Sequence, residues 1–255
     1  MVLVICLFAA STASAEQAQP VSRIAIISAM DTEVDLLLTQ ADIEYIDEIG
    51  GTEFHVRTLC GRNVVIVPSG IGKVMAAAAT AVLFNRYDIS SLIFTGVAGG
   101  VGDRTKVMDM VIATDLVQHD YGQITNDGFI WTPATDNNNG GYYPCDEALV
   151  DLAYNAAVRT IGAEHVFKGT IATGDQFVAS ESYVKELQDR FDAIACEMEG
   201  ASVAAVSRLY GVPFVVIRAM SDKADGLANE SYTNFVDIAA DHSSSIVIKM
   251  LEEMK

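Results

Sequence analysis

The sequence is short of basic residues. Among its 255 residues, 16 are Lys or Arg and 34 are Asp or Glu, so the formal net charge is −18. Such an acidic surface repels phosphate backbones and anionic lipid, which disfavours nucleic acid or a membrane as a partner. Cysteine is scarce too: four residues without close paired spacing exclude a zinc site and are too few for a disulfide scaffold. We expect neither a metal nor another cofactor.

The chain also lacks internal repeats, low-complexity tracts and any linker long enough to divide domains. What it has is a globular composition, with 51% hydrophobic and 20% charged residues. This composition disfavours a disordered, collagen-like or coiled-coil chain, and the length suits one α/β domain. We therefore expect a single domain that occupies residues 23–255.

The N-terminus carries an apolar run at residues 2–10 that is too short to span a bilayer. An Ala13-x-Ala15 pattern follows it, as at a signal-peptide cleavage site. We expect a signal peptide at residues 1–15, a short extension at 16–22 and a periplasmic or secreted protein; an uncleaved N-terminal tail is the alternative. Cleavage would leave three cysteines, of which one pair could form a disulfide: Cys60, Cys145 and Cys196.

Short β-rich runs alternate with helical patterns along the rest of the chain. Strands are expected at residues 24–28, 54–59, 64–68, 92–95, 111–117, 167–172 and 213–218. Helices are expected at 32–39, 73–85, 146–160, 182–190, 200–210 and 232–253. The Asn- and Gly-rich segment 136–141 reads as a loop. The alternation predicts a single three-layer domain, a mixed β-sheet flanked by helices.

Four segments interrupt this pattern where a strand gives way to a loop or helix, which is where ligands bind in such folds. They are residues 28–33, 95–100, 196–200 and 218–222. The second reads as a glycine-rich loop whose amides could approach a ligand closely, although it is neither a Walker loop nor G-x-G-x-x-G. Each segment also has a structural interpretation: helix N-terminal acids, turn glycines, a solvated turn and a structural ion pair, respectively.

Six motifs occur in order: A-M-x-x-E-V at 29–34, S-G-I-G-K at 69–73, T-G-x-A-G-G at 95–100, D-x-F-V at 175–178, E-M-E at 197–199 and R-A-x-S-D at 218–222. Together they resemble the 5′-methylthioadenosine/S-adenosylhomocysteine nucleosidases of the nucleoside phosphorylase superfamily, over about residues 23–250. The resemblance implies a nucleoside phosphorylase-like fold and a homodimer. It also implies hydrolysis of the N-glycosidic bond of these nucleosides, with 5′-deoxyadenosine as a further candidate substrate. The products would be adenine and a 5-substituted ribose.

The resemblance assigns four catalytic residues. Asp222 matches the acid that protonates adenine near N7, a role that requires a raised pKa or a proton shared with the purine. Glu33 matches the base that activates water, and Arg218 would orient Glu33 or the water. Glu199 matches the ionised acceptor of the ribose hydroxyls. All four residues stand in the quoted motifs.

The resemblance also implies a set of substrate-binding residues. Phe177 would stack on the purine, and the Val178 backbone would read its edge. Met198 would pack on the ribose with Glu197 in support, and Ser221 is a further binding residue. Val97 departs from the family, which carries a hydroxyl residue there in bacterial members, so affinity or substrate range should differ. Three residues are expected to form the 5′-alkylthio pocket, although on pattern alone they read as core: Met30, Ile71 and Tyr232.

Three other functions remain open. A nucleoside phosphorylase would gather arginines around phosphate, but near the glycine segment the sequence offers only Arg104. A nucleoside-binding or storage protein would have lost the acid or the base, yet Glu33, Glu199 and Asp222 are present. An aminodeoxyfutalosine nucleosidase would differ only in the 5′ substituent of its substrate, which the motifs do not distinguish.

Overall fold

The computed structural model describes residues 21–134 and 139–254. The expected signal peptide, the extension up to residue 20 and the first half of the expected loop at 136–141 lie outside these ranges. The strands are β1 (Arg23–Ser28), β2 (Asp42–Ile49), β3 (Thr52–Leu59), β4 (Arg62–Pro68), β5 (Ile89–Gly100), β6 (Met110–Gln118), β7 (Gly122–Thr125), β8 (Gly128–Trp131), β9 (Tyr142–Pro144), β10 (Val166–Thr173), β11 (Ala193–Glu197) and β12 (Phe214–Asp222). The helices are α1 (Asp35–Gln40), α2 (Lys73–Arg86), α3 (Glu147–Ile161), α4 (Glu181–Phe191), α5 (Gly200–Tyr210) and α6 (Ala228–Glu253), with 3₁₀ turns at Asp31–Glu33 and Ala163–His165.

The central sheet is mixed and runs in the order β11-β10-β6-β12-β5-β1-β4-β3-β2. Strand β1 pairs in parallel with β4 and β5, whereas β12 pairs in parallel with β5 and antiparallel with β6. Strand β11, at one edge of the sheet, also pairs antiparallel with the end of β5. The pairings β5-β12-β6-β10-β11-β5 therefore close into a ring, which brings the ends of β5, β11 and β12 together.

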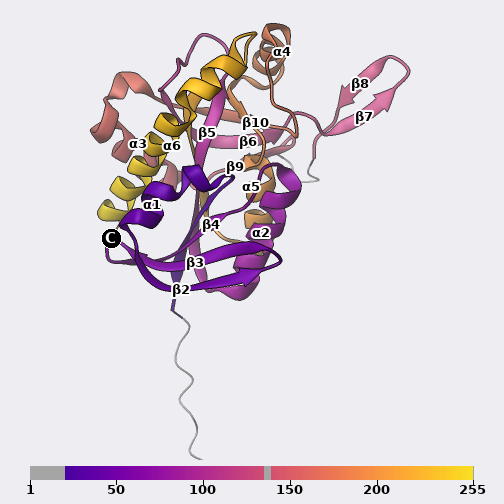
Figure 1. Cartoon of the computed structure of the whole chain (residues 1–255). Helices are drawn as coiled ribbons and strands as arrows, with labels where there is room; N and C mark the ends of the chain where they lie inside the picture. The colour runs from indigo at the N-terminus through magenta and orange to yellow at the C-terminus, as the bar shows by residue number, and fades with distance from the viewer. Residues whose placement is uncertain (1–20, 135–138, 255) are drawn as a thin grey trace, which may run out of the picture.

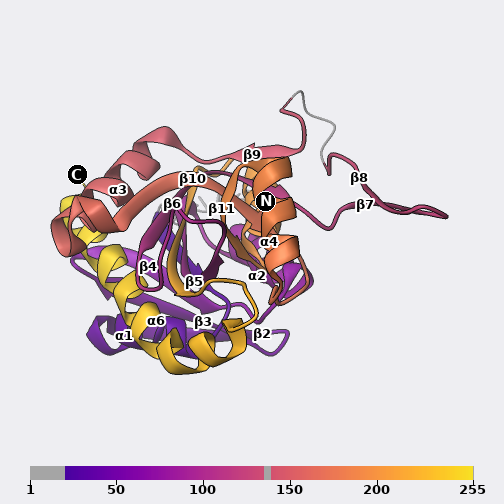
Figure 2. The ribbon, with the colours of Figure 1, turned by 90° about the horizontal axis from the view of Figure 1, so that it is seen from above.

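Helices cover both faces of this sheet (Figures 1 and 2). Helix α6 packs on β12 and β5 and contacts α1 and α3, while α2 and α5 pack together on the opposite side. The strands between them are buried on both faces; β12, for example, is buried along its whole length. The predicted three-layer α/β domain is confirmed. No helix in the described ranges is long and apolar enough to cross a bilayer.

Several elements differ from the sequence expectation. Strand β2 was not predicted because half of its residues are charged and its apolar residues do not alternate regularly with them; most of the strand is exposed. Strands β7, β8, β9 and β11 were missed because each has five residues or fewer. The expected glycine loop at 95–100 is wrong: β5 continues through it to Gly100. Likewise, β12 runs on through residues 218–222.

Candidate active site

A cavity of about 290 Å³ lies where β5, β11 and β12 end. This volume is at the lower limit of small-molecule sites, as suits a small ligand. Among the described residues that line it, three carry carboxyl groups and none is Lys, Arg or His. Eleven of the residues singled out from the sequence line this cavity: Met30, Ile71, Val97, Phe177, Val178, Glu197, Met198, Glu199, Ser221, Asp222 and Tyr232. Glu33 and Arg218 are not among its lining residues.

Asp222 is the last residue of β12, and its carboxyl group lies almost wholly out of solvent. Its Oδ1 accepts a hydrogen bond from the Ala224 amide at 2.7 Å, and its Oδ2 accepts one from Ser221 Oγ at 2.9 Å. Burial raises the pKa of Asp222 above its ordinary value and outweighs these two hydrogen bonds, which act in the opposite direction. This carboxyl group therefore retains a proton to higher pH than an exposed aspartate does.

The glycines of β5 leave room for two carboxyl groups. A Cβ atom at Gly99 would lie 2.8 Å from Asp222 Oδ1, and one at Gly96 would lie 2.6 Å from Glu33 Oε1. Either distance is too short for a carbon, so a larger residue would displace the carboxyl group. From the sequence, these glycines were expected to let the backbone approach a ligand closely. In the structure they instead let the carboxyl groups of Asp222 and Glu33 approach the strand.

Glu33 lies behind the cavity wall and is only 3% exposed. Its Oε2 accepts hydrogen bonds from Ser28 Oγ at 2.6 Å and from the amides of Ala29 and Met30 at 3.0 and 2.9 Å. Its Oε1 accepts one from the Val97 amide at 2.9 Å. Because Ala29, Met30 and Val97 line the cavity, Glu33 fixes the backbone of one wall.

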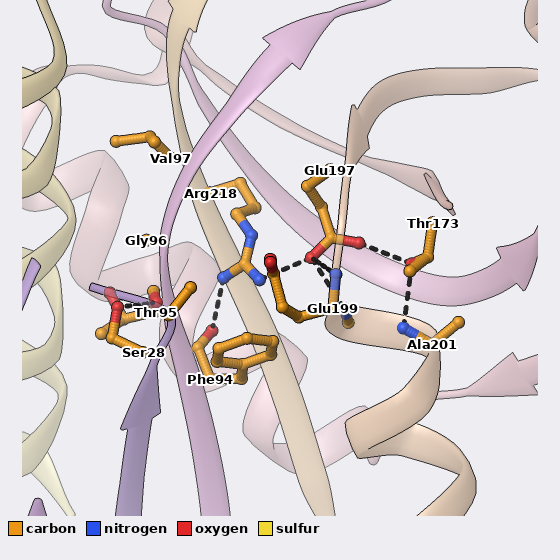
Figure 3. Close-up of polar contacts among 12 residues, drawn as sticks. Ser28, Phe94, Thr95, Gly96, Val97, Thr173, Glu197, Glu199, Ala201 and Arg218 are labelled. Atoms are coloured by element: carbon orange, nitrogen blue, oxygen red, sulfur yellow. Dashed lines mark hydrogen bonds and ion pairs between the residues drawn. The ribbon is translucent and has the colours of Figure 1, made fainter. Parts of the chain in front are cut away.

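Arg218 does not contact Glu33 as expected. Its Nη2 donates to Glu197 Oε2 at 2.6 Å, and its Nη1 donates to the carbonyls of Phe94 and Ile217 (Figure 3). The guanidinium also lies 4.0 Å from the centre of the Phe94 ring. Both partners of the ion pair are buried, so each charge depends on the other. Arg218 was expected to orient Glu33 or the water; the contact with Glu33 is absent, and Arg218 instead supports Glu197, while its orienting the water stays a prediction.

Glu197 and Glu199 lie at the junction of β11 and α5. Glu197 accepts hydrogen bonds from Thr173 Oγ1 at 2.5 Å and from the Gly200 amide at 2.7 Å. Glu199 Oε1 accepts one from the Gly72 amide at 2.7 Å. Burial, and next the negative charge of Glu197, raise the pKa of Glu199 to about 8. Glu199 therefore retains a proton to higher pH than an exposed glutamate does, although the resemblance assigns it an ionised role.

The apolar side of the cavity is formed by rings and sulfur. The Phe177 and Tyr232 rings meet edge to face at 5.6 Å, and Tyr232 Oη donates to Met30 Sδ at 3.3 Å. Phe177 and Ile71 are 46% and 57% exposed, which puts them at the mouth. A second groove of about 850 Å³ shares Ala29, Met30 and Ile71 with the cavity, so the two are adjacent.

The sequence reading missed five lining residues: Ala29, Ala98, Gly99, Gln176 and Cys196. All five lie within or directly beside the quoted motifs, so their position next to predicted site residues could have identified them.

Cys196 and Cys145 are buried free thiols and Cys60 is an exposed one, so no disulfide joins these three residues. In the described ranges, no group of three or more His, Cys, Asp and Glu residues is arranged to hold a metal ion.

Comparisons with known proteins point in one direction. A family model described as "Phosphorylase superfamily" matches residues 23–252. The 5′-methylthioadenosine/S-adenosylhomocysteine nucleosidase of Bacillus cereus (strain G9842) is 40% identical over 234 residues, which cover 91% of this chain and all of the relative.

Solved structures agree. The Streptococcus pneumoniae nucleosidase of the same name, with the transition-state inhibitor MT-ImmA, matches with a TM-score of 0.82 and 33% identity, over 91% of this chain and 100% of that one. A futalosine hydrolase of Helicobacter pylori matches with a TM-score of 0.80 and 33% identity, over 92% and 99% of the two chains.

Proposed function

The chain belongs to the 5′-methylthioadenosine/S-adenosylhomocysteine nucleosidases of the phosphorylase superfamily, and we propose that its carboxyl-lined cavity is where it cleaves nucleosides. It is an N-glycosidase that hydrolyses the N-glycosidic bond of 5′-methylthioadenosine and S-adenosylhomocysteine. The products are adenine and a 5-substituted ribose. The observation that carries the proposal is Asp222, an acid with a raised pKa, in a cavity without a cationic side chain.

Asp222 supplies the proton that the departing adenine needs, because adenine is a poor leaving group as an anion. As the bond breaks, the ribose gains oxocarbenium character, and negative charge nearby stabilises it. Glu199 and Glu197 face the same cavity and provide this charge, with the hydroxyls of the ribose on Glu199. A ribose that donates hydrogen bonds to Glu199 lowers its pKa and so favours the ionised form.

Glu33 acts as the base that takes a proton from the attacking water. Four donors hold its carboxylate in place, and its neighbours Met30 and Val97 line the cavity, so we place the attacking water at this wall. Val97 brings no hydroxyl group to hold that water. Its amide instead holds Glu33 Oε1.

Water, not phosphate, is the nucleophile. Arg218 forms a buried ion pair with Glu197, and Arg104 forms one at the surface with Asp192. A phosphate dianion would enter a cavity whose described lining residues include no Lys, Arg or His to bind it. These observations favour hydrolysis over phosphorolysis.

Product analysis tests this function. The protein is incubated with 5′-methylthioadenosine, S-adenosylhomocysteine, 5′-deoxyadenosine, adenosine and inosine, with and without phosphate, and base release is followed. We expect free 5-methylthioribose from the first substrate at a rate that phosphate does not increase. A ribose 1-phosphate as the main product would establish a phosphorylase instead.

The groove beside Ala29, Met30 and Ile71 gives a long 5′ substituent room beyond the cavity. It supports S-adenosylhomocysteine as a substrate besides the shorter 5′-methylthioadenosine. The likeness to a futalosine hydrolase makes aminodeoxyfutalosine a second candidate, so this nucleoside belongs in the same substrate panel.

The protein also forms a homodimer. The hairpin of β7 and β8 projects from the body (Figure 1), and Ile124, Phe129 and Ile130 on it are exposed. An isolated two-stranded hairpin is marginally stable in water, so a surface that covers these side chains would stabilise it. Sedimentation equilibrium of the parent and of Ile124→Asp tests this: a dimer that dissociates in the variant is expected, and a monomeric parent refutes it.

Export is the remaining proposal. It is supported by the apolar run at residues 2–10 and the Ala13-x-Ala15 pattern, and the family match begins only at residue 23. Fractionation of the native host with N-terminal sequencing should find a mature chain that starts at Glu16 outside the cytoplasm. A cytosolic protein that retains Met1 contradicts export and leaves the enzymatic function unaffected.

A further inference from the structure

Lys73, the first residue of helix α2, carries a charge that is unfavourable at a helix N-terminus. A cation at a helix N-terminus opposes the helix dipole, and the preceding Gly72 has no side chain to cap the helix. The ammonium group turns away to other partners: Lys73 Nζ lies 2.6 Å from Asp120 Oδ1 and 3.2 Å from Gln118 Oε1. The Lys73 and Asp120 side chains are only 17% and 13% exposed, so this pair is shielded from solvent in a way that surface pairs are not.

Asp175 joins this pair to the loop that follows β10. Its Oδ1 accepts a hydrogen bond from the Lys73 amide at 2.8 Å and thereby caps α2 in place of a side chain at Gly72. Its own amide donates to Asp120 Oδ2 at 2.9 Å. Lys73, Asp120 and Asp175 thus form a closed set of contacts among three distant segments of the chain. Burial acts to raise the pKa of Asp120, but the hydrogen bonds from Lys73 and Asp175 prevail, and the pKa lies below its ordinary value.

The next residues along the chain are Gln176, Phe177 and Val178, which line the cavity. They belong to a segment between β10 and α4 that has no helix or strand, and Phe177 is half exposed, so packing alone does not fix them. The far end of this segment is held at Ser180, whose amide donates to the Ala224 carbonyl at 2.8 Å. The near end is held by the Gly174 amide, which donates to the Glu197 carbonyl at 3.1 Å, and next to it by Asp175.

We propose that Lys73 and Asp120 are positioning residues for purine recognition: they hold Asp175 at the N-terminus of α2, so that Phe177 and Val178 are presented to the base. The inference rests on the proposed function, in which Phe177 and Val178 bind adenine. It gives a role to two motif residues, Lys73 and Asp175, that the reaction itself does not use.

The test compares Lys73→Met with the parent protein. Methionine keeps a long apolar side chain but loses the ammonium group. Calorimetry with adenine and steady-state kinetics with 5′-methylthioadenosine should show adenine affinity lower by about tenfold and KM higher by a similar factor, with a smaller change in kcat. Lys73→Arg, which retains the cation, should recover part of both losses.

Lys168→Met is the matched control, because Lys168 Nζ also lies 2.6 Å from a carboxylate, that of Asp151, near the start of β10 and away from the cavity. It should leave adenine affinity and KM unchanged. Asp120→Asn should weaken adenine binding as Lys73→Met does, and the double variant should be little worse than either single one, because the two residues act as one unit.

Unchanged adenine affinity and KM in Lys73→Met would overturn the proposal. So would a loss of kcat and thermal stability at constant KM, since that pattern indicates a structural role alone. Because adenine binding is measured without turnover, a parent protein that fails to hydrolyse nucleosides would refute the proposed function while the comparison of adenine affinities still decides the role of Lys73.

Discussion

Asp222→Asn separates catalysis from stability. The asparagine oxygen can still accept the Ala224 amide, and its NH₂ group can donate to Ser221 Oγ, whose hydroxyl can turn to the Ala98 carbonyl 3.4 Å away. All hydrogen bonds are thus replaced at constant shape, and the free energy of unfolding should change by no more than about 1 kcal/mol. The amide cannot deliver a proton, so kcat should fall by at least about 10²- to 10⁴-fold, the range typical of general acid catalysis.

The assay follows adenine release across pH, together with thermal unfolding. The parent needs Asp222 protonated, so its kcat/KM should fall as pH rises through the Asp222 pKa, which burial has raised. This fall of kcat/KM at high pH should be absent in Asp222→Asn. Asp225→Asn is the control, because Asp225 Oδ1 accepts the Leu227 amide outside the cavity, a bond that asparagine can keep. The Asp225 charge helps to raise the Asp222 pKa, so this control should keep the fall in kcat/KM but move it to lower pH. Activity of Asp222→Asn within a few-fold of the parent would refute the reasoning.

Three further variants test the site. Gly99→Ala should cost about 100-fold in kcat because its Cβ displaces the Asp222 carboxyl group, whereas Gly226→Ala, with open space around it, should be neutral; equal activities would contradict the clash. Glu33→Gln should abolish turnover, keep affinity for a transition-state mimic and lose about 1–3 kcal/mol of stability, because one surrounding N–H group is left without an acceptor. If binding is lost together with turnover, Glu33 is structural. The raised pKa of Glu199 means that the folded protein binds a proton more tightly than the unfolded chain, so stability falls as pH rises from about 4.5 to 8. Thermal melts of Glu199→Gln should lack this fall in stability. If the stability of the variant and of the parent depends on pH in the same way, the Glu199 pKa is not raised.

The sequence by itself determined the architecture and most of the site. Short β-rich runs and Ala-rich helical runs are local patterns, and they predicted the hairpin of β3 and β4 and the helices α2 and α5 closely. Most residues of the cavity could be found because they stand in short motifs beside the ends of strands; Tyr232, in α6, does not. Asp222, Glu199 and Phe177 line the cavity for this reason.

Only the tertiary structure decided what these side chains contact. Arg218 and Glu197 are 21 residues apart, and nothing local indicates that they pair in preference to Arg218 and Glu33. The glycines of β5 look like a loop in the sequence because glycine has a low β propensity. The chain extends there because β11 and β12 both pair with it, and it carries glycine because Glu33 and Asp222 arrive from distant segments to occupy the space where side chains would be. Such contacts depend on how the sheet closes, and no short stretch of sequence encodes that closure.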